Sequence, residues 1–574
     1  MSPDPGGESA AQGPEGSEAA TAAIPADEGR SARLVATGIF LSRIAGFLRE
    51  RVFSYFFGTS LYASAWRAAL RMPNALQNLL GEGTLSASFI PVYSALLEEG
   101  RTRDAGRVAG AVFGILAALS TALVVLGVLL APFIVSVFSP GFEGEQREVT
   151  ITLVRIIFPM TGTLVLSAWA LGILNSHRHF FVPYVAPVLW NLAMIAALLG
   201  FGFTMDGGQR QLVVILGWAA LVGGVLQLAI QLPWVLRLER ELGLRPGAAV
   251  VHVRTILRNA GPAIMGRGVV QLSGYVDLIL ASFLFAGAVA VLGYAQTFYM
   301  LPVSLFGMAI AAAELPELSR AGAARAPELR GRVERALRRM AFWVVPSAAA
   351  FVILGDVIVA ALYQTGAFTP ADTLLVWLVL AAYTIGLLAS TATRLYINIL
   401  YAFHDTRTPA LVALLRVTMA AALGFTLMVY LEDWAIQAGT FAIVPYDGLE
   451  GLTAGSPLRP LGAVGLASGA GLAAWYEWRV LRDVVRERLG PFGVGNHIFR
   501  RLAVAALAGG AAGRAAAWFL PPLDSVPADL GPAVRAVVIL GLFGAVYFGL
   551  ASRLGSAEAD AALARFTGRF QRRG

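Results

Sequence analysis

GRVAGAVFGILAALSTALVVLGVLLAPFIVSVF, residues 106–138, is an apolar run with a single charged side chain near its start. At a rise of about 1.5 Å per residue, a helix over this run exceeds the roughly 30 Å hydrocarbon core of a bilayer. Similar runs recur along the chain of 574 residues, which is 57% hydrophobic and 14% charged. A soluble domain averages about 25% charged residues. The sequence therefore predicts an all-α polytopic membrane protein.

About fourteen transmembrane helices are predicted when a span is taken as roughly 20 apolar residues. The predicted spans are 32–56, 62–97 (broken), 106–138, 148–175, 180–204, 210–236, 254–286, 288–318, 334–362, 373–403, 408–432, 460–484, 498–520 and 530–552.

Arginine-rich and arginine-poor loops alternate between these spans. Arginines gather in 98–107, 237–246, 319–339 and 477–490 and are sparse in loops such as 363–373. The positive-inside rule then places both termini in the cytoplasm, with residues 1–30 a disordered tail and 556–574 a basic tail. The formal charge of +8 is assigned to these loops, so nucleic acid is not expected as a partner.

Several kinds of chemistry have no support in the sequence. There is no cysteine, and the five histidines show no metal-ligand spacing. No GxSxG, Walker A or HExxH motif is present. We therefore expect no catalytic residue, metal or cofactor, and transport driven by an ion gradient, the membrane potential or a downhill substrate.

A weak internal repeat divides the chain. The interval from Gly58 to Pro73 matches that from Gly287 to Pro302, and PVYS (91–94) resembles PELS (316–319). Six predicted helices separate the two copies, which favours two parallel six-helix lobes around a central cavity. The predicted boundaries are an N-lobe over 31–245, a C-lobe over 246–490 and a C-terminal helix pair over 491–555.

Polar side chains inside the first span indicate a function, because buried polar groups in lipid are costly. Arg43 lies about ten residues into the span, next to Ser42, and is predicted to face a cavity. Arg49 and Glu50 lie two turns later. They either line the same cavity or extend to the outer interface.

The second span carries a polar stripe at helical spacing. Its members are Arg67, Arg71, Asn74, Asn78 and Glu82. Pro73 and the glycines of 81–83 predict a kink or break, and broken helices at membrane depth commonly line a water-filled path. The alternative is a helix–helix interface held by hydrogen bonds.

The seventh span repeats this pattern with Arg267 and Gln271 on one face and Asp277 about 80° around the helix. Arg267 and Asp277 either belong to the cavity or form an ion pair. Glu82 and Asp277 are the candidates for ion coupling, and Arg416 is a weaker cavity candidate. A cationic cavity in the membrane suits an anionic head group, because guanidinium forks match phosphate oxygens.

The order and spacing of several motifs resemble the MurJ/MviN family over about residues 31–420. They are SRIAGFLRE (42–50), RMPNALQNLLGEGTLSASFIPVYS (71–94), GPAIMG (261–266), SLFGMAIAAAELPELSR (304–320), YQTGAFTPADT (363–373) and DTRTP (405–409).

The resemblance implies a lipid II flippase of the multidrug/oligosaccharidyl-lipid/polysaccharide exporter superfamily. It implies fourteen helices around a cationic cavity, with the last pair forming a groove for the lipid tail. It also implies alternating access in the bacterial inner membrane, with lipid II, membrane lipids and cell-wall synthases as partners.

The family's polar positions in the first two spans fall on residues named above. They are Ser42, Arg43, Arg49, Glu50, Asn74 and Glu82. Four positions depart from the family pattern. An acid early in the second span is Ser64, the arginine after Pro-Asn is Gln77, an arginine of the eighth span is Thr297, and a nearby glutamate is Met300.

These departures remove expected contacts to the diphosphate, and Arg67 and Arg267 are predicted to supply the missing charge. The preferred function is flipping lipid II for cell-wall synthesis. One alternative is an exporter of another polyprenyl-linked glycan or small molecule, and another is a non-transporting scaffold for cell-wall synthases.

Overall fold

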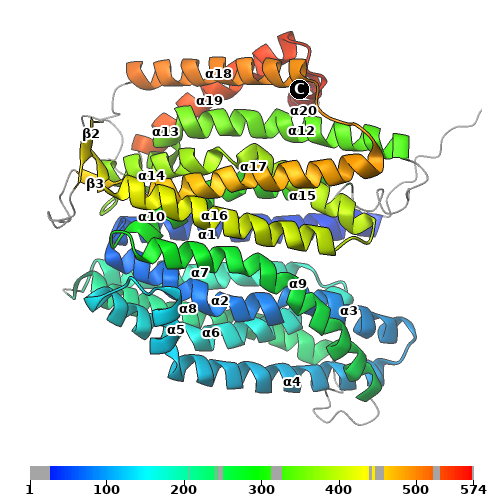
Figure 1. Ribbon diagram of the computed structural model, residues 1–574. Coiled ribbons are helices and arrows are strands. Elements are labelled where there is room, and N and C mark those ends of the chain that lie inside the picture. Colours follow the sequence, from blue (N-terminus) through cyan, green and yellow to red (C-terminus); the bar gives the residue numbers. More distant parts are fainter. Residues whose placement is uncertain are drawn as a thin grey trace, which may run out of the picture.

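A computed structural model of the chain describes residues 26–205, 207–239, 242, 250–311, 314, 326–437, 442–446, 458–520 and 531–571. Within them, long helices lie side by side with their axes roughly along one direction, and a small sheet covers one end (Figure 1). Most of the early helices lie in one half of the bundle and most of the later ones in the other, while the helix over Val250–Ser282 lies beside the early helices (Figure 1).

The first half contains the elements α1 (Ala26–Phe57), α2 (Leu61–Leu80), α3 (Glu82–Glu98), α4 (Thr102–Leu129), α5 (Ala131–Phe138), α6 (Gly144–Ser176), α7 (Phe181–Gly202) and α8 (Gly208–Leu238). The second half contains α9 (Val250–Ser282), α10 (Ala288–Pro302), the π-helix η2 (Val303–Met308), α12 (Ala326–Ile353), α13 (Gly355–Tyr363), α14 (Pro370–Thr384), α15 (Leu387–Ala402), α16 (Arg407–Glu432), β1 (Trp434–Gln437), β2 (Ala442–Pro445), β3 (Leu458–Pro460) and α17 (Gly462–Leu489). The last elements are α18 (Asn496–Phe519), α19 (Gly531–Arg553) and α20 (Ala557–Gln571).

Each predicted span falls on one helix or on consecutive helices, although the end of the eighth lies largely outside the described residues. Among the described residues, nine helices are long and apolar enough to cross a membrane, or ten if the bent pair α14–α15 is one span. The other four predicted spans, on α1, α2–α3, α9 and α17, contain arginines that lower their hydropathy. The chain is therefore an α-helical membrane protein, and the count of fourteen stays a prediction.

Three local features differ from or refine the expectations. The helix α1 begins at Ala26 rather than after residue 30. A three-stranded antiparallel sheet, ordered β2-β1-β3, interrupts the otherwise helical chain between α16 and α17. The basic C-terminal segment contains the helix α20, which contacts α19.

The predicted break in the second span is confirmed at Gly81. The Gly81 N–H still donates to the Gln77 carbonyl at 2.7 Å, but its ψ of −149° ends α2 before α3 begins. A Cβ at this position would lie 2.2 Å from that same carbonyl oxygen. A side chain larger than hydrogen is therefore incompatible with this turn.

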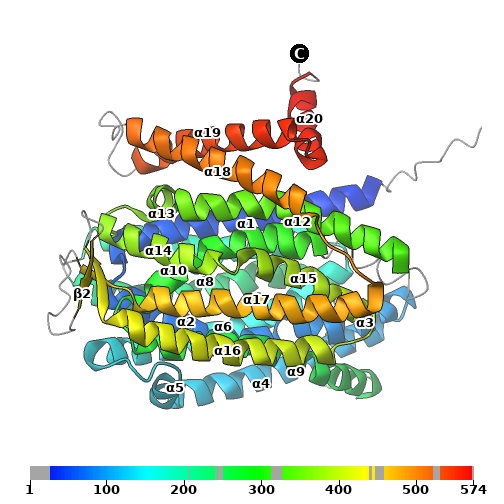
Figure 2. The same cartoon turned by 45° about the horizontal axis from the view of Figure 1, so that its top comes forward.

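The two halves share an apolar core, and the largest cluster of buried apolar side chains draws on helices from both. The helix α9 contacts α2 and α3 on one side and α16 on the other. The predicted boundary at 246 therefore precedes a helix that packs on both halves. In the C-terminal pair, α18 packs on α12 and α19 on α13, outside the second half (Figure 2).

One end of the bundle, here called the sheet end, comprises the α1–α2 turn, the α13–α14 turn and the sheet. The two copies of the predicted repeat meet there, because the Tyr294 hydroxyl donates to the Gly58 carbonyl at 2.9 Å. Gly287 lies so close to the same turn that a Cβ would be 2.2 Å from the Thr59 carbonyl oxygen. The two halves are therefore in direct contact at this end.

Asp372 joins three segments at the sheet end. Its Oδ1 accepts from the Thr59 hydroxyl at 2.7 Å and from Arg459 Nη2 on β3 at 3.1 Å. Its Oδ2 accepts from the Thr369 backbone N–H at 2.8 Å in a capping box that starts α14. The Asp372 side chain is 4% exposed and that of Arg459 is 11% exposed. This buried carboxylate ties the first half, the second half and the sheet together.

Replacing Asp372 should loosen the sheet end. Hydrogen bonds to a charged group contribute about 1.5–3 kcal/mol each. Asp372→Ala should therefore raise the fraction of molecules whose sheet end is open about tenfold or more. The chain has no cysteine, and Ala288 is 0% exposed. In an Ala288→Cys background, the rate of thiol labelling therefore measures how often the sheet end opens.

The matched control is Asp356→Ala, which removes a carboxylate that pairs instead with Arg514 on α18 at 2.6 Å. It should leave labelling at position 288 unchanged. Equal labelling of Asp372→Ala and wild type would contradict the role of Asp372.

Candidate functional site

The first candidate site is a cavity of about 320 Å³ between α1 and the α10–η2 segment, here called the portal cavity. From α1 it is lined by Arg43, Gly46, Phe47, Arg49 and Glu50, and from the facing segment by Thr297, Met300, Leu301 and Ser304. Arg43, Gly46, Phe47 and Glu50 share one helical face because their spacing follows the helical repeat, and Arg49 lies at the edge of that face. The predicted grouping of Arg43 with Arg49 is therefore present, whereas Ser42 is half-buried beside them and is not among the described lining residues.

Glu50 is the shared partner of two arginines in this region. Its Oε1 lies 2.6 Å from Arg49 Nη2, and its Oε2 lies 2.8 Å from Arg67 Nη2 on α2. The side chains of all three residues are below 20% exposed, at 19% for Arg49, 17% for Arg67 and 14% for Glu50. Arg49 Nη1 also donates to the Asn191 side chain on α7 at 3.1 Å. These contacts hold α1, α2 and α7 in a fixed relation.

Arg67 is held by an ion pair and by an aromatic ring, although its Nε has no hydrogen-bond partner in the described part of the chain. Its guanidinium carbon lies 4.2 Å from the centre of the Tyr294 ring, a cation–π contact. Together with the Glu50 ion pair, this contact explains why a cation is tolerated so far from water. Arg67 therefore stabilises the joint between α2 and α10, and the prediction that it replaces the arginine missing at Thr297 is less favoured by this geometry.

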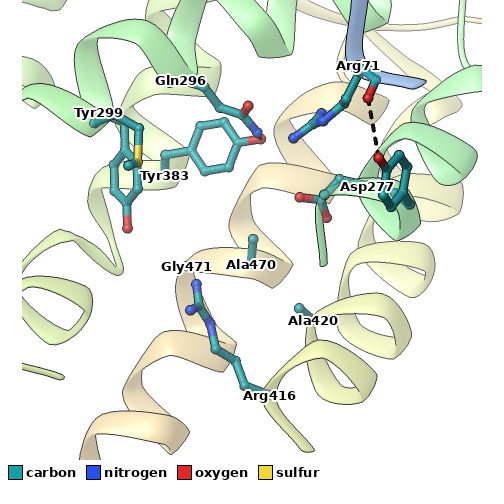
Figure 3. Close-up of a pocket in the computed structure, with 12 residues that line it drawn as sticks. Arg71, Asp277, Gln296, Tyr299, Tyr383, Arg416, Ala420, Ala470 and Gly471 are labelled. Atoms are coloured by element: carbon teal, nitrogen blue, oxygen red, sulfur yellow. Dashed lines mark hydrogen bonds between the residues drawn. The ribbon is translucent and has the colours of Figure 1, made fainter. Parts of the chain in front are cut away.

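The second candidate site is a cavity of about 300 Å³ lined by residues of α2, α9, α10, α14, α16 and α17, here called the α9 cavity, which shares Met300 with the portal cavity. Arg71 from α2, Asp277 from α9 and Arg416 from α16 point into it, and Gln296, Tyr299 and Tyr383 complete its polar wall (Figure 3).

The polar side chains of the α9 cavity are partly engaged with one another. The Tyr275 hydroxyl donates to the Arg71 carbonyl at 3.3 Å, whereas no hydrogen bond joins the Arg71 guanidinium to a described residue. Arg416 Nη1 lies 3.1 Å from Glu477 Oε2, whose side chain is 4% exposed. Asp277 lies between the two arginines and stays the candidate for ion coupling whose side chain the structure describes.

The predicted stripe on α2 is divided between these sites. Arg67 meets Glu50, Arg71 enters the α9 cavity, and Asn74 is half-buried outside both described linings. The remaining predicted site residues have side chains outside the described residues, and these are Asn78, Glu82, Arg267 and Gln271. The portal cavity and the α9 cavity share Met300 in their linings, so they adjoin each other across α10, and the single cationic cavity expected from the sequence stays a prediction.

Three residues of these sites were not identified from the sequence, namely Asn191, Gln296 and Tyr383. Asn191 binds Arg49, and it could have been noticed as a lone amide in the apolar run 180–204. Gln296 donates to the Tyr383 hydroxyl at 3.0 Å in the wall of the α9 cavity. Their helices are mainly apolar, and which face each helix presents to a cavity depends on packing.

The DTRTP motif has a structural role at the end opposite the sheet. Asp405 accepts from the Thr408 backbone N–H at 3.0 Å and from the Arg488 side chain on α17. The Thr408 N–H and hydroxyl, and then Arg488, hold the pKa of Asp405 below its ordinary value. The motif therefore starts α16 and fastens its first turn to α17.

Comparison with known proteins agrees with the resemblance noted from the motifs. Residues 53–443 match the family described as "Lipid II flippase MurJ". The chain is 33% identical over 399 residues to a probable lipid II flippase MurJ of Rhizobium tropici, covering 69% of this chain and 74% of the relative. It is 32% identical over 381 residues to the lipid II flippase MurJ of Burkholderia cenocepacia, covering 65% and 73%.

Two solved structures share the fold. A lipid II flippase MurJ in an inward closed conformation superposes with a TM-score of 0.67 at 22% identity, over 90% of this chain and 99% of that one. An inward-facing multidrug resistance MATE family transporter of the MOP superfamily superposes with a TM-score of 0.60 at 19% identity, over 78% and 94%.

Removing Glu50 should destabilise the fold. Deleting one member of a buried ion pair costs about 3–5 kcal/mol, and Glu50→Ala leaves two arginines without this partner. We expect a clearly lower melting temperature of the purified protein and partial recovery in Glu50→Ala/Arg67→Leu, where the stranded cation is also removed.

The matched control is Glu145→Ala, since the Glu145 side chain is 42% exposed and pairs at the surface with Arg210. It should cost below about 1 kcal/mol. A Glu50→Ala protein that melts with wild type would contradict the proposed role of the shared carboxylate.

Proposed function

Because the chain belongs to the MurJ family of lipid II flippases, we propose that it moves lipid II, the lipid-linked peptidoglycan precursor, between the leaflets of the membrane. The observation that carries the proposal is the placement of Arg43 and Arg49 on the α1 face of the portal cavity. The facing wall is the α10–η2 segment, so the two arginines lie in a cavity between helices that are mainly apolar. A lipid with an anionic head group fits such a place.

The chemistry of the portal cavity suits a diphosphate. A guanidinium can donate two parallel hydrogen bonds to phosphate oxygens. Arg49 is already paired with Glu50 at 2.6 Å, whereas Arg43 is exposed within the cavity lining. Arg43 is therefore the cation with the greater capacity to bind an incoming phosphate.

Alternating access accounts for movement across the membrane. The sheet end is closed by Asp372, Tyr294 and the turns they bind. In this state a head group would enter from the opposite end, and the contacts at the sheet end would break for release. This cycle describes transport rather than catalysis, with Asp277 the proposed ion-coupling residue.

The orientation follows from charge. Arginines gather at the end opposite the sheet, among them Arg101, Arg103, Arg107, Arg407, Arg486 and Arg488. By the positive-inside rule this end faces the cytoplasm. We therefore propose a protein of the bacterial inner membrane with both termini in the cytoplasm, working beside cell-wall synthases.

One observation favours a second candidate. Gln77 and Thr297 stand where the family resemblance implies arginines, and Thr297 donates to the Gly293 carbonyl of its own helix at 3.0 Å. A related polyprenyl-linked glycan would then be the cargo. A scaffold without transport is disfavoured, because it has no use for an arginine-lined cavity.

Complementation distinguishes lipid II from another lipid-linked cargo. In a bacterium depleted of its own lipid II flippase, wild type should restore growth and Arg43→Ala should fail at equal membrane levels. Arg210→Ala, which alters a 56% exposed arginine at the sheet end, should restore growth as wild type does. Failure of well-inserted wild type would point to another lipid-linked cargo, and full rescue by Arg43→Ala would contradict the role of the portal cavity.

A further inference from the structure

The first half contains a third cavity, of about 460 Å³, that differs from the other two in charge. Its polar wall consists of Gln77 on α2, Ser86 on α3, Ser167 on α6 and Gln227 on α8. None of its described lining residues is charged. This hollow, here called the amide cavity, lies beside the α2–α3 break and has the size of a ligand site, about 300–1,000 Å³.

The wall of the amide cavity has unused hydrogen-bonding capacity. Ser167 Oγ accepts from Gln227 Nε2 at 3.2 Å and from Gln231 Nε2 at 2.6 Å, so its own proton is left to donate. Behind the wall Gln231 is 1% exposed, and its Oε1 has no hydrogen-bond partner in the described part of the chain. The side chain of Gln77 makes no hydrogen bond to a described residue.

This chemistry selects the kind of group that can bind. A carboxylate or phosphate would meet no described guanidinium in the lining, and a cation would meet no described carboxylate. Amides and hydroxyls offer donors and acceptors together, which matches an uncharged group that carries both. An acetamido sugar and a peptide amide share this property.

The amide cavity lies close to the portal cavity along α7. Pro187 lines the amide cavity, and Asn191 binds Arg49 at 3.1 Å. These two residues are four apart, about 6 Å along a helix. The Asn191 amide also donates to the Pro187 carbonyl at 3.0 Å. The α7 residue that binds Arg49 and the α7 residue that lines the amide cavity are therefore one helical turn apart.

We propose that the amide cavity binds the uncharged, amide-bearing part of the lipid II head group while Arg43 and Arg49 face its diphosphate. The proposal rests on the proposed function and assigns a subsite to Gln77, Ser167 and Gln227. Sugar and diphosphate are covalently adjacent in the ligand. One cationic wall and one uncharged wall that lie close together can therefore bind both groups at once.

The test compares two lipids on the full-length protein in nanodiscs. Lipid II carries the sugar–peptide head group, and undecaprenyl diphosphate has the same anionic linkage without it. Gln77→Leu and Gln227→Leu should each weaken lipid II binding about three- to tenfold, as expected for the loss of one uncharged hydrogen bond. Both variants should bind undecaprenyl diphosphate as wild type does, which also shows that they are folded.

Gln211→Leu is the matched control, because Gln211 lies on the same helix α8 but is exposed near the sheet end. It should change neither affinity. Undecaprenyl diphosphate bearing only N-acetylglucosamine then separates the two sources of the amide. Weakened binding of this lipid by Gln227→Leu assigns the subsite to the sugar, and an effect on lipid II alone assigns it to the peptide.

Unchanged lipid II affinity in both variants would overturn the subsite and leave a cavity that holds water only. An equal loss for lipid II and undecaprenyl diphosphate would also overturn it, since the effect would not depend on the head group. The proposed function fails separately, if wild type binds neither lipid more tightly than phosphatidylglycerol, and the subsite would fall with it.

Discussion

The joint on which the structure depends is the sharing of Glu50 by Arg49 and Arg67. In an apolar bundle an unpaired guanidinium is expensive, and a carboxylate with two oxygens can satisfy two of them. The contacts of 2.6 Å and 2.8 Å connect α1 to α2, while Asn191 and Tyr294 extend the connection to α7 and α10. The face of α1 that lines the portal cavity is thus fixed by charge balance.

This joint leaves the arginines of the bundle in different states. Arg67 pairs with Glu50 and lines neither described cavity, whereas Arg49 pairs with Glu50 and also lines the portal cavity. Arg43 lines the portal cavity and is exposed there. On α2, Arg71 turns to the α9 cavity, where the carboxylate of Asp277 lies between it and a second cation, Arg416. Cations that look equivalent along the chain therefore differ in their capacity to bind a ligand.

The contacts between the halves at the sheet end are of another kind. They include hydrogen bonds from turns and from one buried carboxylate, as in the Tyr294–Gly58 and Thr59–Asp372 pairs, beside the buried rings of the shared apolar core. Hydrogen bonds of this kind can break and re-form as units. A transporter that alternates between two states needs a boundary of this type at the end that opens.

The sequence by itself determined the membrane class, the helix order and the break at Gly81, because apolar length and glycine content act locally. It also marked the polar side chains on α1 and α2, since any charge inside an apolar run is conspicuous. It did not determine which of them meet: Arg67 and Arg71 share a predicted stripe yet enter different surroundings. The sheet and the amide cavity were not predicted, because Ser167, Gln77 and Gln227 are far apart in sequence and unremarkable singly. Only tertiary packing decided those partners, since pairing energies depend on distances between helices that periodicity does not specify.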